Sequence, residues 1–92
     1  MIMENRVGSY TNFRAVTAEE VKIYEKVMNG LVGVERKVLA AAKQIVNGTN
    51  YAFLCDSKVV VPNAEPYNDL VIIHKPINGD PQIMEIRKVE LI

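Results

Sequence analysis

The sequence of 92 residues has a single cysteine, no tryptophan and no excess of either charge. Because Cys55 is alone, no intramolecular disulfide can form, which suits a reducing compartment. Eleven basic residues balance eleven acidic ones, so we expect no general attraction to nucleic acid or to an anionic membrane. No apolar run approaches the roughly 20 residues that a transmembrane helix needs. The sequence therefore predicts a soluble globular protein.

Groups for catalysis and for metal binding are scarce as well. His74 is the only histidine, and both it and Cys55 fall in segments that alternate like strands. A zinc site needs three or four soft ligands, which the chain lacks, and no glycine-rich phosphate loop follows a strand. Glu19 and Glu20 fit a helix start rather than an acid–base pair. We therefore expect no enzymatic activity, no cofactor and no metal site.

The start of the chain shows no signal-peptide pattern, so we expect a cytoplasmic protein, or a secreted one if a signal was removed. The length predicts one domain over residues 1–92. Residues 1–16 lack periodicity and are interpreted as an arm. Thr17 and Glu20 then form a capping box, which predicts a helix over residues 17–31. Its expected buried stripe consists of Val21, Tyr24, Val27, Met28 and Leu31.

Residues 34–46 fit two structures. Apolar residues at helical spacing, with Asn47-Gly48 as a stop, would give a second helix. Alternating apolar residues would instead give a long strand, with Asn47-Gly48 as the tip of a hairpin. The local pattern slightly favours the helix, because three consecutive alanines at positions 40–42 are good helix formers.

The rest of the chain, within residues 34–92, is β in character. One strand contains Tyr51, Phe53, Cys55, Val59 and Val61 in alternation, and others are expected over residues 67–75 and 82–91. The last of these changes its apolar phase, which a β-bulge would explain. Three or four antiparallel strands with one amphipathic helix across a face predict an α+β fold.

The segment Gln44-Ile45-Val46-Asn47-Gly48 has an unusual composition for a turn. Ile45 and Val46 are branched and apolar, and they stand beside a tight turn where polar side chains are usual. At an exposed tip they would form a contact surface. The alternative is that one of them completes the core.

This same segment resembles the Gln-x-Val-x-Gly signature of the cystatins. Lys43 before it and Thr49-Asn50-Tyr51 after it extend the resemblance, which is carried further by Val7-Gly8 in the arm and Pro76-Ile77 in a second turn. Pro76-Ile77 stands where many cystatins have Pro-Trp. With one cysteine, the chain is most similar to the disulfide-free, stefin-like type.

The resemblance implies a long helix held by a curved antiparallel sheet, with residues 34–46 as a strand. It also implies a papain-like cysteine protease as partner and domain-swapped dimers alongside the monomer. The residues that would bind the protease in a three-part wedge are Val7, Gly8, Gln44, Ile45, Val46, Asn47, Gly48, Pro76 and Ile77. The alternative function is a protein-binding or scaffolding module with this fold and no protease target.

Overall fold

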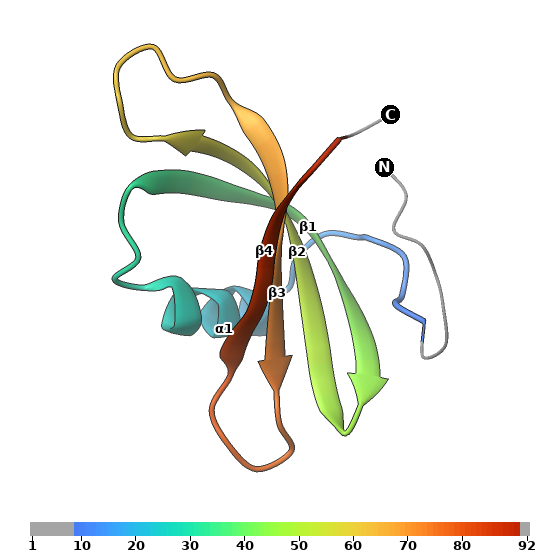
Figure 1. Ribbon diagram of the computed structural model, residues 1–92. Helices are drawn as coiled ribbons and strands as arrows, with labels where there is room; N and C mark the ends of the chain where they lie inside the picture. The colour runs from blue at the N-terminus through green and yellow to red at the C-terminus, as the bar shows by residue number, and fades with distance from the viewer. Residues whose placement is uncertain (1–8, 91–92) are drawn as a thin grey trace.

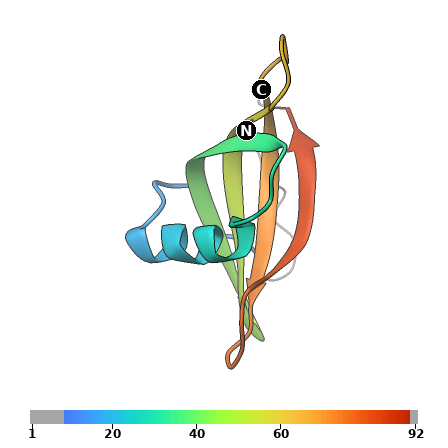
Figure 2. The same cartoon turned by 90° about the vertical axis from the view of Figure 1, so that its left-hand side faces the viewer.

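The computed structural model describes residues 9–90 of the chain (Figure 1). These residues form one helix and four strands, which are α1 (Ala18–Met28), β1 (Val34–Val46), β2 (Gly48–Val59), β3 (Tyr67–Lys75) and β4 (Gln82–Val89). The strands make one antiparallel sheet in the order β1-β2-β3-β4, and α1 lies across one face of it (Figure 2). The expected α+β architecture is confirmed. Within residues 9–90 no helix is long and apolar enough to cross a membrane.

The helix begins as the capping box predicts. The Glu20 N–H donates to Thr17 Oγ1 at 3.2 Å, and the Thr17 N–H donates to Glu20 Oε1 at 2.9 Å. Arg14 adds two hydrogen bonds of 2.6 and 2.7 Å to the same carboxylate, and its backbone pairs with Ala41 of β1. Arg14 therefore ties the start of α1 to the edge of the sheet, through its side chain on the helix and its backbone on β1.

The helix ends earlier than the sequence suggests. It stops at Met28, and Gly30 follows with a φ of +91°. Leu31, expected in the buried stripe, is exposed, so that part of the prediction is wrong. Met28 and Val27 do reach the core, and Ile23 joins them on the buried side.

Residues 34–46 form a strand, so the helical alternative for this segment is wrong. The whole of β1 pairs with β2, from Val34 opposite Val59 to Val46 opposite Gly48, with one irregularity between Val38 and Ala40. The ladder supplies a hydrogen-bonded partner strand along the entire segment, and this tertiary pairing overrides the helix propensity of the alanines.

β4 contains a bulge, but it lies before Ile86. The prediction that a bulge explains the change of apolar phase between Ile86 and Val89 is therefore wrong, because these two residues stand in regular register opposite Val71 and Asn68. The register passes from Ile72 opposite Glu85 to Ile73 opposite Ile83, so Met84 is an extra residue on the β4 side. A bulge of this kind turns the following side chains to the other face.

The core lies between α1 and the face of the sheet that it covers. Tyr24 of the helix meets Phe53 edge to face, with ring centroids 5.2 Å apart. Cys55 is fully buried in the same layer, and burial raises the pKa of its thiol to about 11. The buried side chains of this cluster are Met28, Ala41, Phe53, Cys55, Val71 and Ile73.

Two buried carboxylates are paired rather than left alone. Asp69 of β3 accepts hydrogen bonds from Ser57 Oγ at 2.7 Å and from Arg36 Nε at 3.1 Å. Glu20 has the Arg14 guanidinium and the Thr17 N–H. An unpaired buried carboxylate would cost several kcal/mol, on the order given by buried ion-pair deletions. These pairs let the small domain keep charges inside.

We expect Glu20→Gln to lower the free energy of unfolding by about 1 to 3 kcal/mol at pH 7, because the charge-assisted bonds from Arg14 are lost. Burial alone would raise the pKa of Glu20, but its hydrogen bonds with Arg14 and Thr17 outweigh burial and lower it. A carboxylate with a lowered folded-state pKa stabilises the fold above its unfolded pKa of about 4.3 and loses this contribution as the pH falls. Urea unfolding at a series of pH values measures both effects.

Glu19→Gln is the matched control, because Glu19 is exposed in the same helical turn. It should change stability by only a few tenths of a kcal/mol, through the helix dipole. Equal losses in the two variants, or an unchanged acid sensitivity in Glu20→Gln, would contradict the assigned role of Glu20.

Candidate functional site

The tips of the two hairpins lie side by side at one end of the sheet. The first hairpin, β1–β2, turns at Asn47, and the second, β3–β4, turns over residues 76–81. Thr49 of β2 pairs with Lys75 of β3, so the base of one tip adjoins the base of the other. Both views show the two tips together at the lower end of the molecule (Figures 1 and 2).

Gly48 makes this close approach sterically feasible. Its φ is +103°, a conformation that side-chain-bearing residues rarely adopt. A Cβ at this position would overlap the Lys75 carbonyl oxygen and would lie 2.9 Å from Pro76 Cα. The glycine of the signature therefore serves two purposes, because it closes the first hairpin and lets the backbone of the second hairpin lie against it.

The apolar residues at the tips point into solvent. Ile45 is 69% exposed, Val46 40% and Ile77 70%, so neither Ile45 nor Val46 completes the core. Isolated exposed apolar residues are common, but three branched ones on two adjoining tips form a surface suited to burial against a partner.

The other predicted site residues have more structural surroundings. Gln44 is half-buried, and its Oε1 accepts a hydrogen bond of 3.0 Å from Asn50 Nδ2. Asn47 is exposed at the turn itself, and Pro76 is half-buried beneath the second tip. Val7 and Gly8 lie outside the described residues, so the structure does not place them.

The described part of the arm follows the free edge of β1. Thr11 N–H donates to the Lys43 carbonyl at 2.8 Å, and the Lys43 N–H donates to Thr11 Oγ1 at 3.0 Å. Lys43 precedes Val46 by three residues, so these bonds place the described start of the arm beside the strand that leads into the first tip. The arm and the first tip therefore share one end of the molecule.

A groove of 600 Å³ lies between the first tip and the start of β4 and contains His74. The other residues that line it are Val46, Asn47, Asn50, Gln82, Ile83 and Met84. This lining has no thiol, hydroxyl or carboxylate beside the imidazole. Cys55 cannot supply one, because its side chain belongs to the core on the opposite face of the sheet, whereas His74 bonds Asn50. The two residues do not form a nucleophile–base pair.

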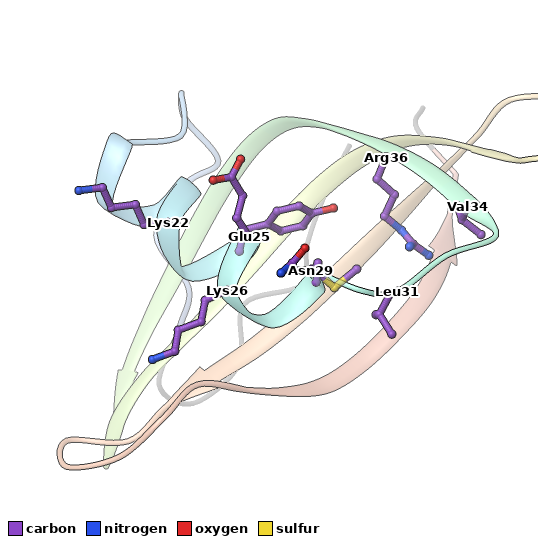
Figure 3. Close-up of a pocket in the computed structure, with 9 residues that line it drawn as sticks. Lys22, Glu25, Lys26, Asn29, Leu31, Val34 and Arg36 are labelled. Carbon is purple, nitrogen blue, oxygen red and sulfur yellow. The ribbon is translucent and has the colours of Figure 1, made fainter.

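A second cavity, of 630 Å³, lies at the far end of α1 from the capping box (Figure 3). The residues that surround it include Arg36 and Val34 of β1 and, from the loop between α1 and β1, Asn29 and Leu31 (Figure 3). The Arg36 guanidinium is already paired with Asp69 at 3.1 Å. Within residues 9–90 no group of three or more potential ligands could hold a metal ion.

Sequence reasoning placed Asn50 next to the signature but missed its partners, and it missed His74 and Tyr10 as parts of this end of the molecule. Asn50 and His74 stand directly opposite each other in β2 and β3, and Gln44 is opposite Asn50 in β1. The alternation of β2 predicts that Asn50 and Tyr51 point to opposite faces. The partners of Asn50 follow only from the register of three strands.

We expect Gly48→Ala to destabilise the protein by about 2 to 4 kcal/mol, because backbone strain adds to the overlap with Lys75 and Pro76. Gly33→Ala is the matched control, since Gly33 has a φ of +100° but open space around its Cα. It should cost only the backbone strain, about 1 kcal/mol. Thermal and urea unfolding of both variants separate the two contributions, and equal losses would show that the approach of the second hairpin is unimportant.

No family model matches the sequence, and no curated protein matches it either. The structure is similar to a secreted type 1 cystatin from Fasciola hepatica, with a TM-score of 0.63 and 24% sequence identity. The match covers 90% of this chain and 97% of that protein. The resemblance drawn from the sequence is thus confirmed for the fold. One helix on an open four-stranded antiparallel sheet, matched over nearly its whole length, gives this chain the cystatin fold.

Proposed function

We propose that the chain is a reversible, non-covalent inhibitor of papain-like cysteine proteases that binds through its two hairpin tips and its arm. The observation that carries this proposal is the convergence of the tips. Ile45, Val46 and Ile77 are exposed on adjoining turns, and Gly48 lies against the second hairpin. An edge of this shape fits a cleft rather than a flat surface.

The energetics favour such a contact. Burying a branched apolar side chain fully contributes roughly 1.5 to 3 kcal/mol. The tips are closed hairpins whose backbone is already ordered by the β2–β3 ladder, so docking loses little conformational entropy. A rigid edge with apolar ends therefore has the properties that a tight reversible complex requires.

The same geometry explains why a protease would be blocked rather than supplied with a substrate. A substrate must present an extended segment across the catalytic thiolate. The first tip reverses direction within Val46-Asn47-Gly48, so the main chain at the tip is a tight turn. The structural likeness to a type 1 cystatin supports the proposal. The resemblance of the sequence to the cystatins implies a papain-like cysteine protease as the partner.

A second candidate function, protein binding without a protease target, is favoured by one observation. The opposite end of the sheet exposes an apolar surface formed by Leu31, Val32, Val60 and Val61, here termed the valine patch. The Val60 N–H donates to the Gly33 carbonyl at 2.9 Å, which joins the two loops that carry it. If the molecule bound a partner through the valine patch, the hairpin tips would be dispensable.

We expect Val46→Asp to weaken papain binding by two orders of magnitude or more while the protein stays folded. Val46 is partly exposed and has little packing to lose, whereas a carboxylate buried without a partner in a complex costs several kcal/mol. Inhibition titrations and thermal melting of the same variant provide the two measurements.

Val61→Asp is the matched control, because it places the same charge on an exposed valine at the other end of the molecule. It should leave papain inhibition unchanged. Wild-type protein without any effect on papain would refute the inhibitor proposal. A loss of partner binding in Val61→Asp but not in Val46→Asp would favour the valine patch and the second function.

We also expect domain-swapped dimers that open the first hairpin and do not inhibit papain. In such a dimer residues 45–48 would extend into one continuous strand, which β-branched Ile45 and Val46 prefer. Size-exclusion chromatography after heating at high protein concentration would separate the two forms. Isolated dimers that inhibit as well as monomers would show that the first tip is not the hinge.

A further inference from the structure

Asn50 occupies a central position behind the first tip, two residues after Gly48. Its Oδ1 lies 2.7 Å from His74 Nδ1, and its Nδ2 donates to Gln44 Oε1 at 3.0 Å. The three residues stand opposite one another on β1, β2 and β3. One carboxamide therefore joins the strand that enters the first tip to the strand that enters the second.

The arm reaches the same side chain. Tyr10 lies beside the Asn50 side chain and interacts with it. The pKa of Tyr10 is raised, first by burial and then by the nearby charge of Glu85. Glu85 stands opposite Ile72 on the face away from α1, next to the row of Asn50 and His74. The arm therefore passes the edge of β1 and reaches this face of the sheet at Tyr10. In the sequence, Tyr10 closely follows the predicted contact residues Val7 and Gly8.

We propose that Asn50 is a positioning residue that holds the arm and the two hairpin tips in one fixed arrangement. This inference rests on the proposed function, because it concerns the edge that would enter the protease cleft. Asn50 itself need not touch the protease. It acts through Tyr10, Gln44 and His74. Tyr10 lies in the arm, Gln44 in the strand that leads into the first tip, and His74 in the strand that leads into the second tip.

A carboxamide is well suited to this role. Its oxygen accepts while its nitrogen carries two donors, so the one group can serve the three neighbouring side chains at once. An aspartate at this position keeps an acceptor for His74 but has no donor for Gln44. A leucine has neither. The amide is also neutral, so it sits half-buried between strands without the cost of a charge.

The functional effect should exceed the effect on folding. Each cross-strand bond is a minor part of a fold that the β1–β2 and β2–β3 ladders already define. Binding is more sensitive, because three segments must reach one cleft together and any freedom that they regain is lost again on docking. We expect Asn50→Leu to raise the papain dissociation constant roughly tenfold to a hundredfold, mainly through faster dissociation.

The experiment compares Asn50→Leu and Asn50→Asp with Asn68→Leu. Asn68 is the matched control, because its side chain donates to the Cys55 carbonyl at 3.2 Å toward the other end of the sheet. Amide hydrogen exchange of the free proteins reports on the tips and the arm, and papain kinetics report on binding. Faster exchange should appear together at residues 10–11, 45–48 and 77–79 in Asn50→Leu, and at none of them in Asn68→Leu. Asn50→Asp should be intermediate.

Coupling is tested separately by double variants. Tyr10→Phe and His74→Ala should each weaken papain binding in the wild-type background and add little in the Asn50→Leu background. Fully additive effects, or faster exchange confined to the first hairpin, would overturn the inference. So would wild-type binding by a folded Asn50→Leu protein. If the wild type does not bind papain, the proposed function fails, and hydrogen exchange in the free protein still decides whether Asn50 joins the three segments.

Discussion

The contact between Gly48 and the backbone of Lys75 and Pro76 is the constraint on which the proposed binding end of the molecule depends. No side chain fits there, and the positive φ of Gly48 closes the first hairpin at the same point. Because β2 begins at Gly48 and pairs with the end of β3, this contact also fixes how the two hairpins lie against each other. The turn of the first hairpin therefore adjoins the base of the turn of the second.

The rest of the sheet is built to hold this end rigid. Ala41 and Ala42 are fully buried on opposite faces of β1, and Ala52 stands opposite Ala42 in β2. Small side chains here leave room for neighbouring groups on both faces of the first hairpin. Charged groups that enter the interior, Glu20 and Asp69, are each bound by an arginine. The fold thus combines a small apolar core with a few satisfied polar contacts.

The distribution of exposed apolar residues links this architecture to function. Branched side chains gather at the hairpin tips and at the valine patch, which lie at opposite ends of the β1–β2 hairpin. Behind the tips, the polar row of Gln44, Asn50 and His74 is hydrogen-bonded across three strands. Apolar ends on a hydrogen-bonded base are what a preorganised binding edge needs, since they supply contact area without conformational freedom.

The sequence by itself determined the features that depend on neighbouring residues. Thr17 and Glu20 specify the start of α1, because a capping box needs only residues three positions apart. The alternation from Tyr51 to Cys55 specifies the face of β2 that packs against α1, and the composition of residues 44–48 specifies an apolar turn.

Tertiary structure decided whatever depends on strands meeting. Residues 34–46 become a strand because β2 pairs with them along their length, although their alanines favour a helix locally. Leu31 is exposed because the helix ends before it. The two hydrogen-bond partners of Asn50 lie 6 and 24 positions away in the sequence, and only the register of the sheet brings them together. Tyr10, beside the same side chain, lies 40 positions away and is brought there by the path of the arm. Hydrogen bonds form between neighbours in space, and that neighbourhood is a property of the folded chain.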